Sequence, residues 1–423
     1  MTVPASAATD APSRLAETAR IAVLGAFFVI VLLATGVFAP GLVDPAGNAF
    51  LQQGVVEGLW IVVLALSLPF ARFDRLRWDR RVGLLVVFVF WAVLSSLWAG
   101  GISDMAKASV LAVNVFAVFV LVVTQKAEDV VDTLVAGLFA LAAASIALVI
   151  VAPDVAVLDT WQHAGLWGGV FDQKPTLGIT SAFLLYLAAM RVGARPGRGI
   201  LIYHLAAMAV AAACILGSGS RGGGVLAVLA VVLGLASRHS AAIARFTASV
   251  PIIALAVTGV MMAMLAVSDR DVLTFGDFDV DFTERTFIWK HVLDWTTETS
   301  ALFGSGLNGF WTRKEVADAF LGAHGWFLDN YHNGYLAIFG DCGFVGVGLF
   351  LALAVAVASV DFGRTPSEVA LEKLMTGFLA LFAVINVTET YLLRSTNIAS
   401  ILFFFFVFRL FTGERAADGD AAG

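Results

Sequence analysis

The sequence has few charged residues and almost no cysteine. Asp, Glu, Lys and Arg make up only 14% of its 423 residues, whereas an average soluble domain has about 25%. Hydrophobic residues make up 60%. This balance excludes a soluble globular enzyme, a disordered chain and a nucleic-acid-binding protein. The two cysteines, Cys214 and Cys342, lie in or beside apolar runs and indicate neither a disulfide framework nor a metal site.

Several common motifs are also missing. The chain has no phosphate-binding loop, no dinucleotide-binding fingerprint and no internal repeat, and no His, Cys and carboxylate cluster has the spacing of metal ligands. We therefore expect no cofactor and no metal. Any chemistry must come from polar side chains, which are rare enough here to be considered one by one.

Long apolar runs dominate the chain. A helix needs about 20 mostly apolar residues to cross a bilayer, and the runs have roughly that length. We therefore predict an all-α polytopic membrane protein with about 12 transmembrane helices. The predicted spans are residues 21–39, 55–71, 82–99, 107–124, 130–152, 174–190, 200–217, 222–237, 249–267, 333–358, 371–389 and 396–411.

The positions of Lys and Arg indicate how these spans are oriented. With a cytoplasmic N-terminus, most of the 26 basic residues fall in cytoplasmic segments. Both termini are then cytoplasmic, with a tail at residues 1–20 and a disordered tail at 412–423. Residues 21–267 contain helices 1–9, and residues 333–411 contain helices 10–12.

Residues 268–332 form the only loop that is large enough to fold, and it lies on the outer side. Within it, residues 283–298 read TERTFIWKHVLDWTTE, with apolar side chains at helical spacing. We predict a short amphipathic helix that lies on or beside the membrane surface. Its expected apolar face consists of Phe287, Ile288, His291, Val292 and Trp295. Asp281 and Glu284 resemble a capping box at its start.

Two arginines lie at predicted helix starts, which is the unfavourable end of the helix dipole for a cation. Arg221 lies within GSGSRGGG, residues 217–224, and Arg285 lies in the first turn of the loop helix. Free backbone N–H groups, glycine and a guanidinium fork suit a phosphate, and two such cations could clamp one diphosphate. For Arg221 the alternative is an arginine that marks the membrane edge. For Arg285 it is a solvated arginine paired with Glu284 or Asp281.

His332 lies in NYHNGYL, residues 330–336, at the outer start of a predicted span. A helix N-terminus disfavours the imidazolium, and a neutral ring can accept a proton as a general base. The alternative is an interfacial histidine whose hydrogen bonds are satisfied. Four glycines follow at close spacing and would let this helix pack tightly against its neighbours. They are Gly340, Gly343, Gly346 and Gly348.

Other polar residues at outer span mouths are weaker candidates. Lys174 lies in GVFDQKPTLG, at the start of a span. Glu389 and Arg394 flank the last outer turn. Glu389 is a candidate second base, a ligand of an acceptor sugar, or only the partner of Arg394. We treat Lys174, Asn333, Glu389 and Arg394 as candidate substrate-binding residues.

Six segments, in this order and on this side, resemble motifs of the O-antigen ligase and polysaccharide polymerase family of bacterial inner membranes. They are GVFDQKPTLG at 169–178, SGSRGG at 218–223, ERTFIW at 284–289, GSGLNGF at 304–310, HNGYL at 332–336 and NVTE at 386–389. They extend from the sixth predicted span to the eleventh, and the first five spans match by topology alone. Pro175 departs from the family, which commonly has asparagine after this lysine.

The resemblance implies a donor, an acceptor and a location. Family members transfer a glycan from undecaprenyl diphosphate to a sugar hydroxyl on the periplasmic face, without metal or nucleotide sugar. The acceptor is the lipid A core in a ligase and another lipid-linked repeat unit in a polymerase. By resemblance, Arg221 and Arg285 hold the donor diphosphate and His332 activates the acceptor. Besides the lipid bilayer, chain-length regulators and export proteins are implied partners, and nucleic acid is not.

The motifs leave other functions open. The HNGYL and ERTFIW segments look closer to exopolysaccharide polymerases, so we favour polymerisation of exopolysaccharide or O-antigen repeat units over ligation to lipid A core. Twelve spans also suit a transporter of polysaccharide or lipid-linked substrates, although no half-and-half repeat is evident. An assembly protein without chemistry is a further alternative. Our prediction is a metal-independent, inverting glycan transferase with its active site on the periplasmic face.

Overall fold

The computed structural model describes most of the chain. The described residues are 14–34, 50–73, 76–159, 163–171, 173–193, 197–268, 273–275, 278–280, 282, 285–328, 330–362 and 365–414. The helices are α1 (Arg14–Leu33), α2 (Phe50–Ser67), α3 (Val82–Ser95), α4 (Ile102–Thr124), α5 (Ala127–Val151), α6 (Pro153–Ala156), α7 (Lys174–Gly193), α8 (Arg198–Ser218), α9 (Arg221–His239), α10 (Ala241–Ala266), α11 (Thr286–Thr299), α12 (Lys314–His324), α13 (Gly334–Ala358), α14 (Pro366–Ile385) and α15 (Ile398–Phe411). Two small antiparallel sheets pair β1 (Leu76–Trp78) with β4 (Thr412–Glu414), and β2 (Leu273–Phe275) with β3 (Phe278–Val280).

The apolar runs form helices, as the sequence predicts. Eight of the described helices are long and apolar enough to cross a membrane, and three shorter apolar helices accompany them. The eight lie in α1, α2, α4, α5, α7, α8, α10 and α13, and the shorter ones at residues 82–98, 221–233 and 398–411. Every predicted span overlaps a helix, including α14. The chain is therefore a multi-pass membrane protein, and a count of 12 crossings stays a prediction.

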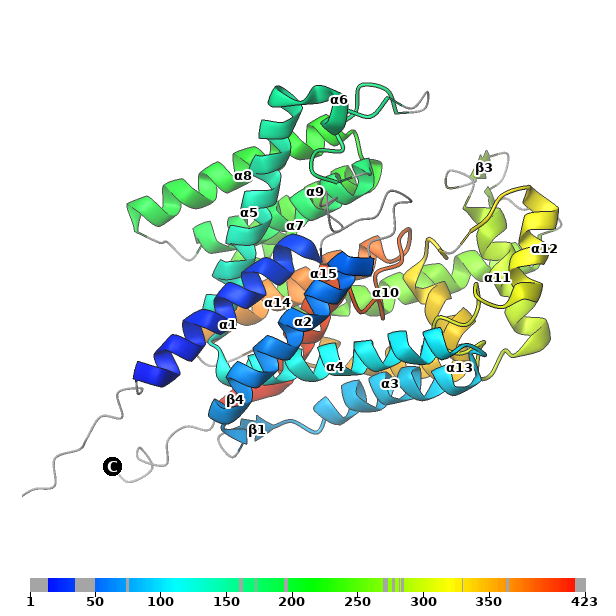
Figure 1. The fold of residues 1–423 in the computed structure, drawn as a ribbon, viewed down its shortest axis with the longest axis horizontal. Coiled ribbons are helices and arrows are strands. Elements are labelled where there is room, and N and C mark those ends of the chain that lie inside the picture. Colours follow the sequence, from blue (N-terminus) through cyan, green and yellow to red (C-terminus); the bar gives the residue numbers. More distant parts are fainter. Residues whose placement is uncertain are drawn as a thin grey trace, which may run out of the picture.

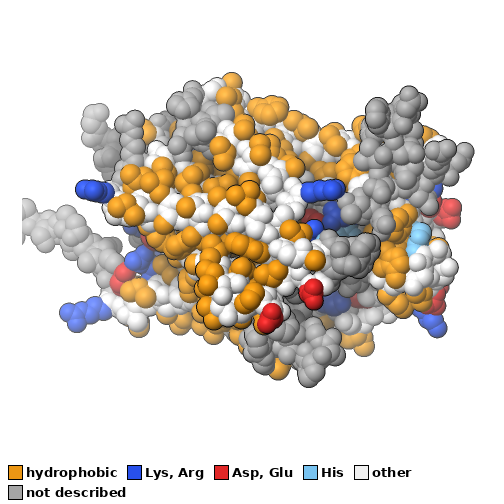
Figure 2. All heavy atoms as spheres, turned by 90° about the horizontal axis from the view of Figure 1, so that it is seen from above, with side chains coloured by type: hydrophobic (Ala, Val, Ile, Leu, Met, Phe, Trp, Pro, Cys, Tyr) orange, Lys and Arg blue, Asp and Glu red, His pale blue; other side chains and the backbone are white. Residues whose placement is uncertain are grey.

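The outer surface of the bundle is apolar. Hydrophobic side chains cover a broad area of the face shown in Figure 2, with charged side chains at its borders. Large apolar side chains such as Val151 and Leu216 are more than 80% exposed. Inside the bundle, α15 buries 12 of its 14 residues, as expected of a helix that is surrounded by other helices. Such a surface is suited to contact with lipid.

The first helix begins earlier than the predicted span 21–39. That span places Arg14 and Arg20 ahead of the helix, but α1 includes both. Arg20 pairs with Glu17 (2.8 Å) and with Asp129 of α5 (2.6 Å). Because these carboxylates balance the guanidinium, the helix continues through this position. The last residues of the predicted span lie outside the described residues, as does most of the predicted C-terminal tail, which begins in β4.

The helix ends form two sets at opposite ends of the bundle. At one end β1 pairs with β4, and Arg191 of α7 pairs with Asp132 of α5 (2.6 Å). This end lies at the lower left of Figure 1, near the marked C-terminus. At the other end, the amide of Gly334 at the start of α13 donates to Asn386 O after α14 (2.7 Å). These contacts agree with the prediction that successive helices cross the membrane in alternating directions. The side of the membrane that each end faces stays a prediction.

α13 is broken inside its apolar stretch. Gly343 has a φ of 65° and a ψ of −167°, which a residue with a side chain rarely adopts. The break lets the loop after α11 pair with the helix, since Phe344 N donates to Ala301 O (2.9 Å). The sequence predicts one continuous helix with a glycine ladder for tight packing. Gly343 interrupts the predicted continuous helix. The close packing is confirmed at Gly340, where a Cβ would lie 2.8 Å from the side chain of Tyr331, but not at Gly348, where a Cβ would meet nothing within 4 Å.

The predicted loop helix exists, but its buried face differs from the expected one. α11 packs against α10 and α13. The expected face omits Trp289, which is fully buried and whose Nε1 donates to Tyr331 O (3.1 Å). Phe287 is only half-buried and stacks on Phe320 of α12, a helix that the sequence analysis did not predict. The proposed capping residues Asp281 and Glu284 lie outside the described residues.

Candidate functional site

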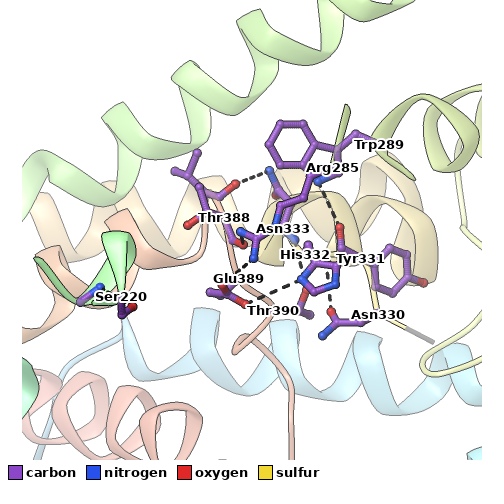
Figure 3. A network of polar contacts seen from close by, with 12 residues as sticks. Ser220, Arg285, Trp289, Asn330, Tyr331, His332, Asn333, Thr388, Glu389 and Thr390 are labelled. Atoms are coloured by element: carbon purple, nitrogen blue, oxygen red, sulfur yellow. Dashed lines mark hydrogen bonds and ion pairs between the residues drawn. The ribbon is translucent and has the colours of Figure 1, made fainter. Parts of the chain in front are cut away.

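Three segments that are far apart in the sequence meet at the turn between α14 and α15. Asn333, just before α13, donates through Nδ2 to Val387 O of this turn (2.9 Å). Arg285, just before α11, donates through Nη1 to Thr388 O. The HNGYL, NVTE and ERTFIW segments are therefore parts of one arrangement, which Figure 3 shows from close by.

Glu389 connects two of the side chains that the sequence singled out. Its Oε1 accepts a hydrogen bond from Arg285 Nη2 (2.9 Å). Its Oε2 lies 3.8 Å from His332 Nδ1, which is an ion-pair contact longer than a hydrogen bond. Only 17% of the Glu389 side chain is exposed. The sequence left open whether Glu389 pairs with Arg394, and the structure pairs it with Arg285 and His332 instead.

The surroundings of Glu389 keep it ionised. Burial raises the pKa of its carboxyl group, but the contact with His332 and the charge of Arg285 outweigh burial and lower the pKa below its ordinary value of 4.5. A negative charge therefore faces the imidazole at Nδ1. The start of α13 is therefore not the only source of electric field at His332, because this carboxylate opposes it.

The backbone around His332 is unusual and firmly held. His332 has a φ of 48°, in the left-handed region, and its amide donates to Asn330 Oδ1 (3.0 Å). Asn333 is fully buried and caps α13, because its Oδ1 accepts from Tyr335 N (3.0 Å) and Leu336 N (2.9 Å). The side chain of Asn333 is thus engaged within the fold. His332 keeps 27% of its side chain exposed, and its Nδ1 has no hydrogen-bond partner among the described residues.

Arg221 is the first residue of α9 and points away from the bundle core. Gly219 ends α8 in the left-handed region with a φ of 56°. Ser220 then caps α9 by accepting a hydrogen bond from Gly223 N (3.1 Å). Arg221 is exposed, and its side chain has no hydrogen bond or ion pair with any residue in the described ranges. The guanidinium is therefore free to meet a ligand.

α9 brings Arg221 to the same end of the bundle as Glu389. A Cβ at Gly222 would lie 3.4 Å from the side chain of Ile385, the last residue of α14. The amide of Glu389 donates to Ile385 O (2.8 Å). Figure 3 shows Ser220, which directly precedes Arg221, apart from the group around Glu389 and to its left. The structure therefore brings the predicted arginines and the histidine to one end.

Lys174 lies at this end as well. It is half-buried and is the first residue of α7, and Pro175 follows it. Proline is tolerated there because backbone N–H groups in the first turn make no hydrogen bond within the helix. A Cβ at Gly223 would lie 2.7 Å from the backbone of Gly178, one turn into α7. The starts of α7 and α9 are thus in direct contact, and Lys174 lies beside the helix that begins with Arg221.

Arg394 faces a different group. It lines a small cavity together with Asp341 and Asn308. Asp341 accepts hydrogen bonds from Tyr331 OH (2.5 Å) and from Asn308 N (3.2 Å). Asp341 is not among the predicted site residues, although an ionisable residue inside an apolar span is a signal of function or of a specific partner. Tyr331 links this group to the site, because it directly precedes His332.

The comparisons with known proteins match one part of the chain. Residues 206–351 match a family model described as O-antigen ligase. This segment, about a third of the chain, is similar to O-antigen ligases. The match includes Arg221, Arg285 and His332, whereas the turn with Glu389 lies beyond it. No curated protein and no solved structure matches the chain.

Members of this family are membrane enzymes that transfer glycans, either as ligases or as polymerases. The segment that matches this family contains the two arginines and the histidine. The turn between α14 and α15 supplies the carboxylate that holds two of them. No group of three or more His, Cys, Asp or Glu side chains within the described residues could hold a metal ion.

Proposed function

We propose that the chain transfers a glycan from undecaprenyl diphosphate to a sugar hydroxyl on the periplasmic face of a bacterial inner membrane. One observation carries this proposal. Arg285, Glu389 and His332 converge at one turn, and the unpartnered Arg221 lies at a neighbouring helix start. We favour polymerisation of exopolysaccharide or O-antigen repeat units, on the HNGYL and ERTFIW segments, and ligation to lipid A core is the second candidate.

In this proposal Arg221 and Arg285 bind the donor diphosphate. Arg221 is exposed and ready to pair, whereas Arg285 is only 23% exposed and is fixed by Thr388 and Glu389. Negative charge grows on the diphosphate as it leaves the sugar. Fixed cations therefore stabilise the transition state more than the bound substrate, which is the condition for catalysis. Lys174 adds a third cation at the same end.

His332 is the proposed base. With Nδ1 directed at Glu389, Nε2 is left to take the proton from the acceptor hydroxyl. The acceptor oxygen forms a bond to the anomeric carbon while the bond from that carbon to the diphosphate oxygen breaks. The electron pair leaves on the diphosphate, and attack from the opposite side inverts the anomeric configuration. Such a base contributes typically about 10²–10⁴-fold to a rate.

The remaining candidates take different roles in this scheme. Asn333 positions His332 by capping α13, because its polar atoms already bond within the fold. Arg394 faces Asp341 and not the diphosphate site. In this scheme α11, which begins directly after Arg285, would cover the site and shield the reacting groups from water.

A transfer assay tests the proposal. The purified chain would receive a lipid diphosphate-linked repeat unit without metal or nucleotide sugar, and the products would be separated by size. A ladder of longer lipid-linked glycans supports a polymerase. Transfer that requires added lipid A core supports a ligase. If folded protein yields no product with either acceptor, the proposal fails and the transporter alternative gains.

Variants separate the site from the rest of the fold. Arg221→Ala, Arg285→Ala and His332→Ala should each abolish transfer while the protein stays in the membrane. Lys290→Ala is the matched control, because Lys290 also lies on α11 but pairs with Asp294 (3.1 Å). It should keep transfer close to the parent level. Full activity in any of the first three variants would remove that residue from the mechanism.

A further inference from the structure

Asp341 is a buried carboxylate that the proposed transfer reaction does not use. It lies two turns into α13, a helix that is long and apolar enough to cross a membrane, and only 5% of the residue is exposed. A carboxylate at such a position is costly unless hydrogen bonds or a nearby cation replace the water that it has lost. The contacts of Asp341 therefore indicate what it does in the fold.

The two oxygens of Asp341 hold two different segments. Oδ1 accepts a hydrogen bond from Tyr331 OH (2.5 Å), and Oδ2 accepts one from Asn308 N (3.2 Å). Arg394 lines the same small cavity, so a positive charge lies near the carboxylate. Burial and then the charge of Asp341 raise the pKa of the Tyr331 hydroxyl well above its ordinary value. The hydroxyl therefore stays protonated and donates its hydrogen to Asp341.

Tyr331 connects this carboxylate to both parts of the candidate site. Its carbonyl oxygen accepts a hydrogen bond from Trp289 Nε1 (3.1 Å). The amide of Trp289 in turn donates to Arg285 O (3.0 Å) at the start of α11. His332 follows Tyr331 directly, and its backbone lies in the left-handed region with a φ of 48°. The position of Tyr331 therefore affects both Arg285 and His332.

The ring of Tyr331 is tightly enclosed. The residue is only 2% exposed, and its ring lies beside those of Phe310 (5.5 Å between centroids) and Trp311 (5.8 Å). A Cβ at Gly340 would lie 2.8 Å from the ring, so this glycine leaves the space that the ring fills. Apolar packing has no direction, whereas a hydrogen bond does. The bond to Asp341 therefore fixes the direction in which the buried ring points.

We infer that Asp341 is a positioning residue, which holds His332 in place for catalysis through Tyr331. The inference rests on the proposed function, in which His332 takes the proton from the acceptor hydroxyl. His332 Nδ1 lies 3.8 Å from Glu389, so a small backbone shift changes both this contact and the reach of Nε2. A misplacement of about 1 Å can cost about 10²-fold in rate. Asp341 acts through Tyr331 and takes no part in the chemistry.

The kinetics of three variants test the inference. Tyr331→Phe removes the hydroxyl and keeps the ring. We expect its kcat to fall by about 10–100-fold, the scale of one hydrogen bond to a charged group, with the KM for the lipid-linked donor unchanged. Asp341→Asn keeps one acceptor oxygen and should keep more of the parent kcat than Asp341→Ala. The parent kcat in Tyr331→Phe or in Asp341→Ala would overturn the inference.

Tyr186→Phe is the matched control. Tyr186 is fully buried in α7, and its hydroxyl donates to Leu374 O of α14 (2.9 Å). Each of the two Tyr→Phe variants loses a buried hydrogen bond, so both should have a lower melting temperature than the parent. Only Tyr331→Phe should have a lower kcat per folded protein. Equal losses of kcat in the two variants would mean that Tyr331 affects stability alone.

Chemical labelling separates this inference from the proposed function. The reaction of His332 with diethyl pyrocarbonate can be followed by mass spectrometry on the full chain without substrate. In Tyr331→Phe the ring of His332 is no longer held beside Glu389 and should react several times faster than in the parent. His163, between α6 and α7, should react at the parent rate. An unchanged rate at His332 would contradict the inference. Absence of transfer by the parent would count against the proposed function, and the labelling would still decide whether Tyr331 and Asp341 hold His332.

Discussion

At the scale of single residues, Glu389 gives the site its order. Its two oxygens face different partners, Arg285 and His332, which come from segments more than 40 residues apart in the chain. The carboxylate holds the guanidinium in one position and sets a negative charge beside the imidazole. No spacing rule links residue 389 to residues 285 and 332, so this arrangement is a property of the folded chain.

The buried carboxylate of Glu389 should make stability depend on pH. Because its pKa is lowered in the fold, its ionised form stabilises the protein fully above about pH 4.5 and this contribution is lost as the pH falls further. Glu389→Gln should therefore be less stable than the parent at neutral pH and should lose less stability on acidification. Melting temperatures followed by tryptophan fluorescence from neutral to acid pH check this.

Glu298→Gln is the control for that series. Glu298 is exposed near the end of α11, far along the helix from Arg285. Its substitution should leave the pH profile of the parent unchanged. If Glu389→Gln showed the same acid profile as the parent, the ion pairs of Glu389 would contribute nothing to stability.

At the scale of elements, two glycines decide how closely helices and loops approach. Gly223 of α9 lies against the backbone of Gly178 in α7, and Gly343 opens α13 to the loop after α11. Gly224 and Gly348 on the same helices have no such role, since a Cβ at either position would meet nothing within 4 Å. Each glycine at a contact therefore has a matched control on its own helix.

Gly223→Ala should push α7 and α9 apart. Its Cβ would lie 2.7 Å from the backbone of Gly178, which cannot move aside as a flexible side chain would. Overpacking of this kind costs typically about 1–3 kcal/mol. Transfer activity should fall too, because Arg221 begins the displaced helix. Gly224→Ala should be neutral or slightly stabilising, as alanine favours a helix over glycine by up to about 1 kcal/mol. The melting temperatures and transfer rates of both variants test this prediction, and equal values for the two variants would contradict it.

Gly343→Ala should strain the break in α13. Its φ of 65° is unfavourable for alanine, and the added Cβ would collide with the backbone of Leu302. We expect the variant to lose at least about 1 kcal/mol of stability. Gly348→Ala on the same helix should show no loss. Equal melting temperatures of the two variants would mean that α13 can close into a continuous helix.

At the scale of the whole molecule, the orientation in the membrane can be measured without removing the two native cysteines. Cys214 and Cys342 are both completely buried, so engineered cysteines would be labelled against little background. Ala323→Cys, on α12, should react with a membrane-impermeant thiol reagent in intact spheroplasts. Asp361→Cys, between α13 and α14, should react only after permeabilisation. The reverse pattern would place the candidate site on the cytoplasmic face.

The sequence identified some residues of the candidate site and not others. Arg221, Arg285 and His332 could be singled out because charged or titratable groups at helix starts in an apolar chain are costly and few. Asp341 meets the same criterion, but it lies inside the predicted span 333–358 and not at a helix start. The sequence left the role of Glu389 open, because its partner depends on which distant segments meet in the fold.

The sequence by itself determined that the chain is a helical membrane protein, because the length and composition of an apolar run act within one segment. It also pointed to the residues of the candidate site, since a helix start can be read from local sequence. Only the tertiary structure decided that Glu389 pairs with Arg285 and not with Arg394, that Asn333 caps α13, and that Gly343 breaks it. Each of these depends on contacts between segments distant in the chain, and local spacing carries no information about such contacts.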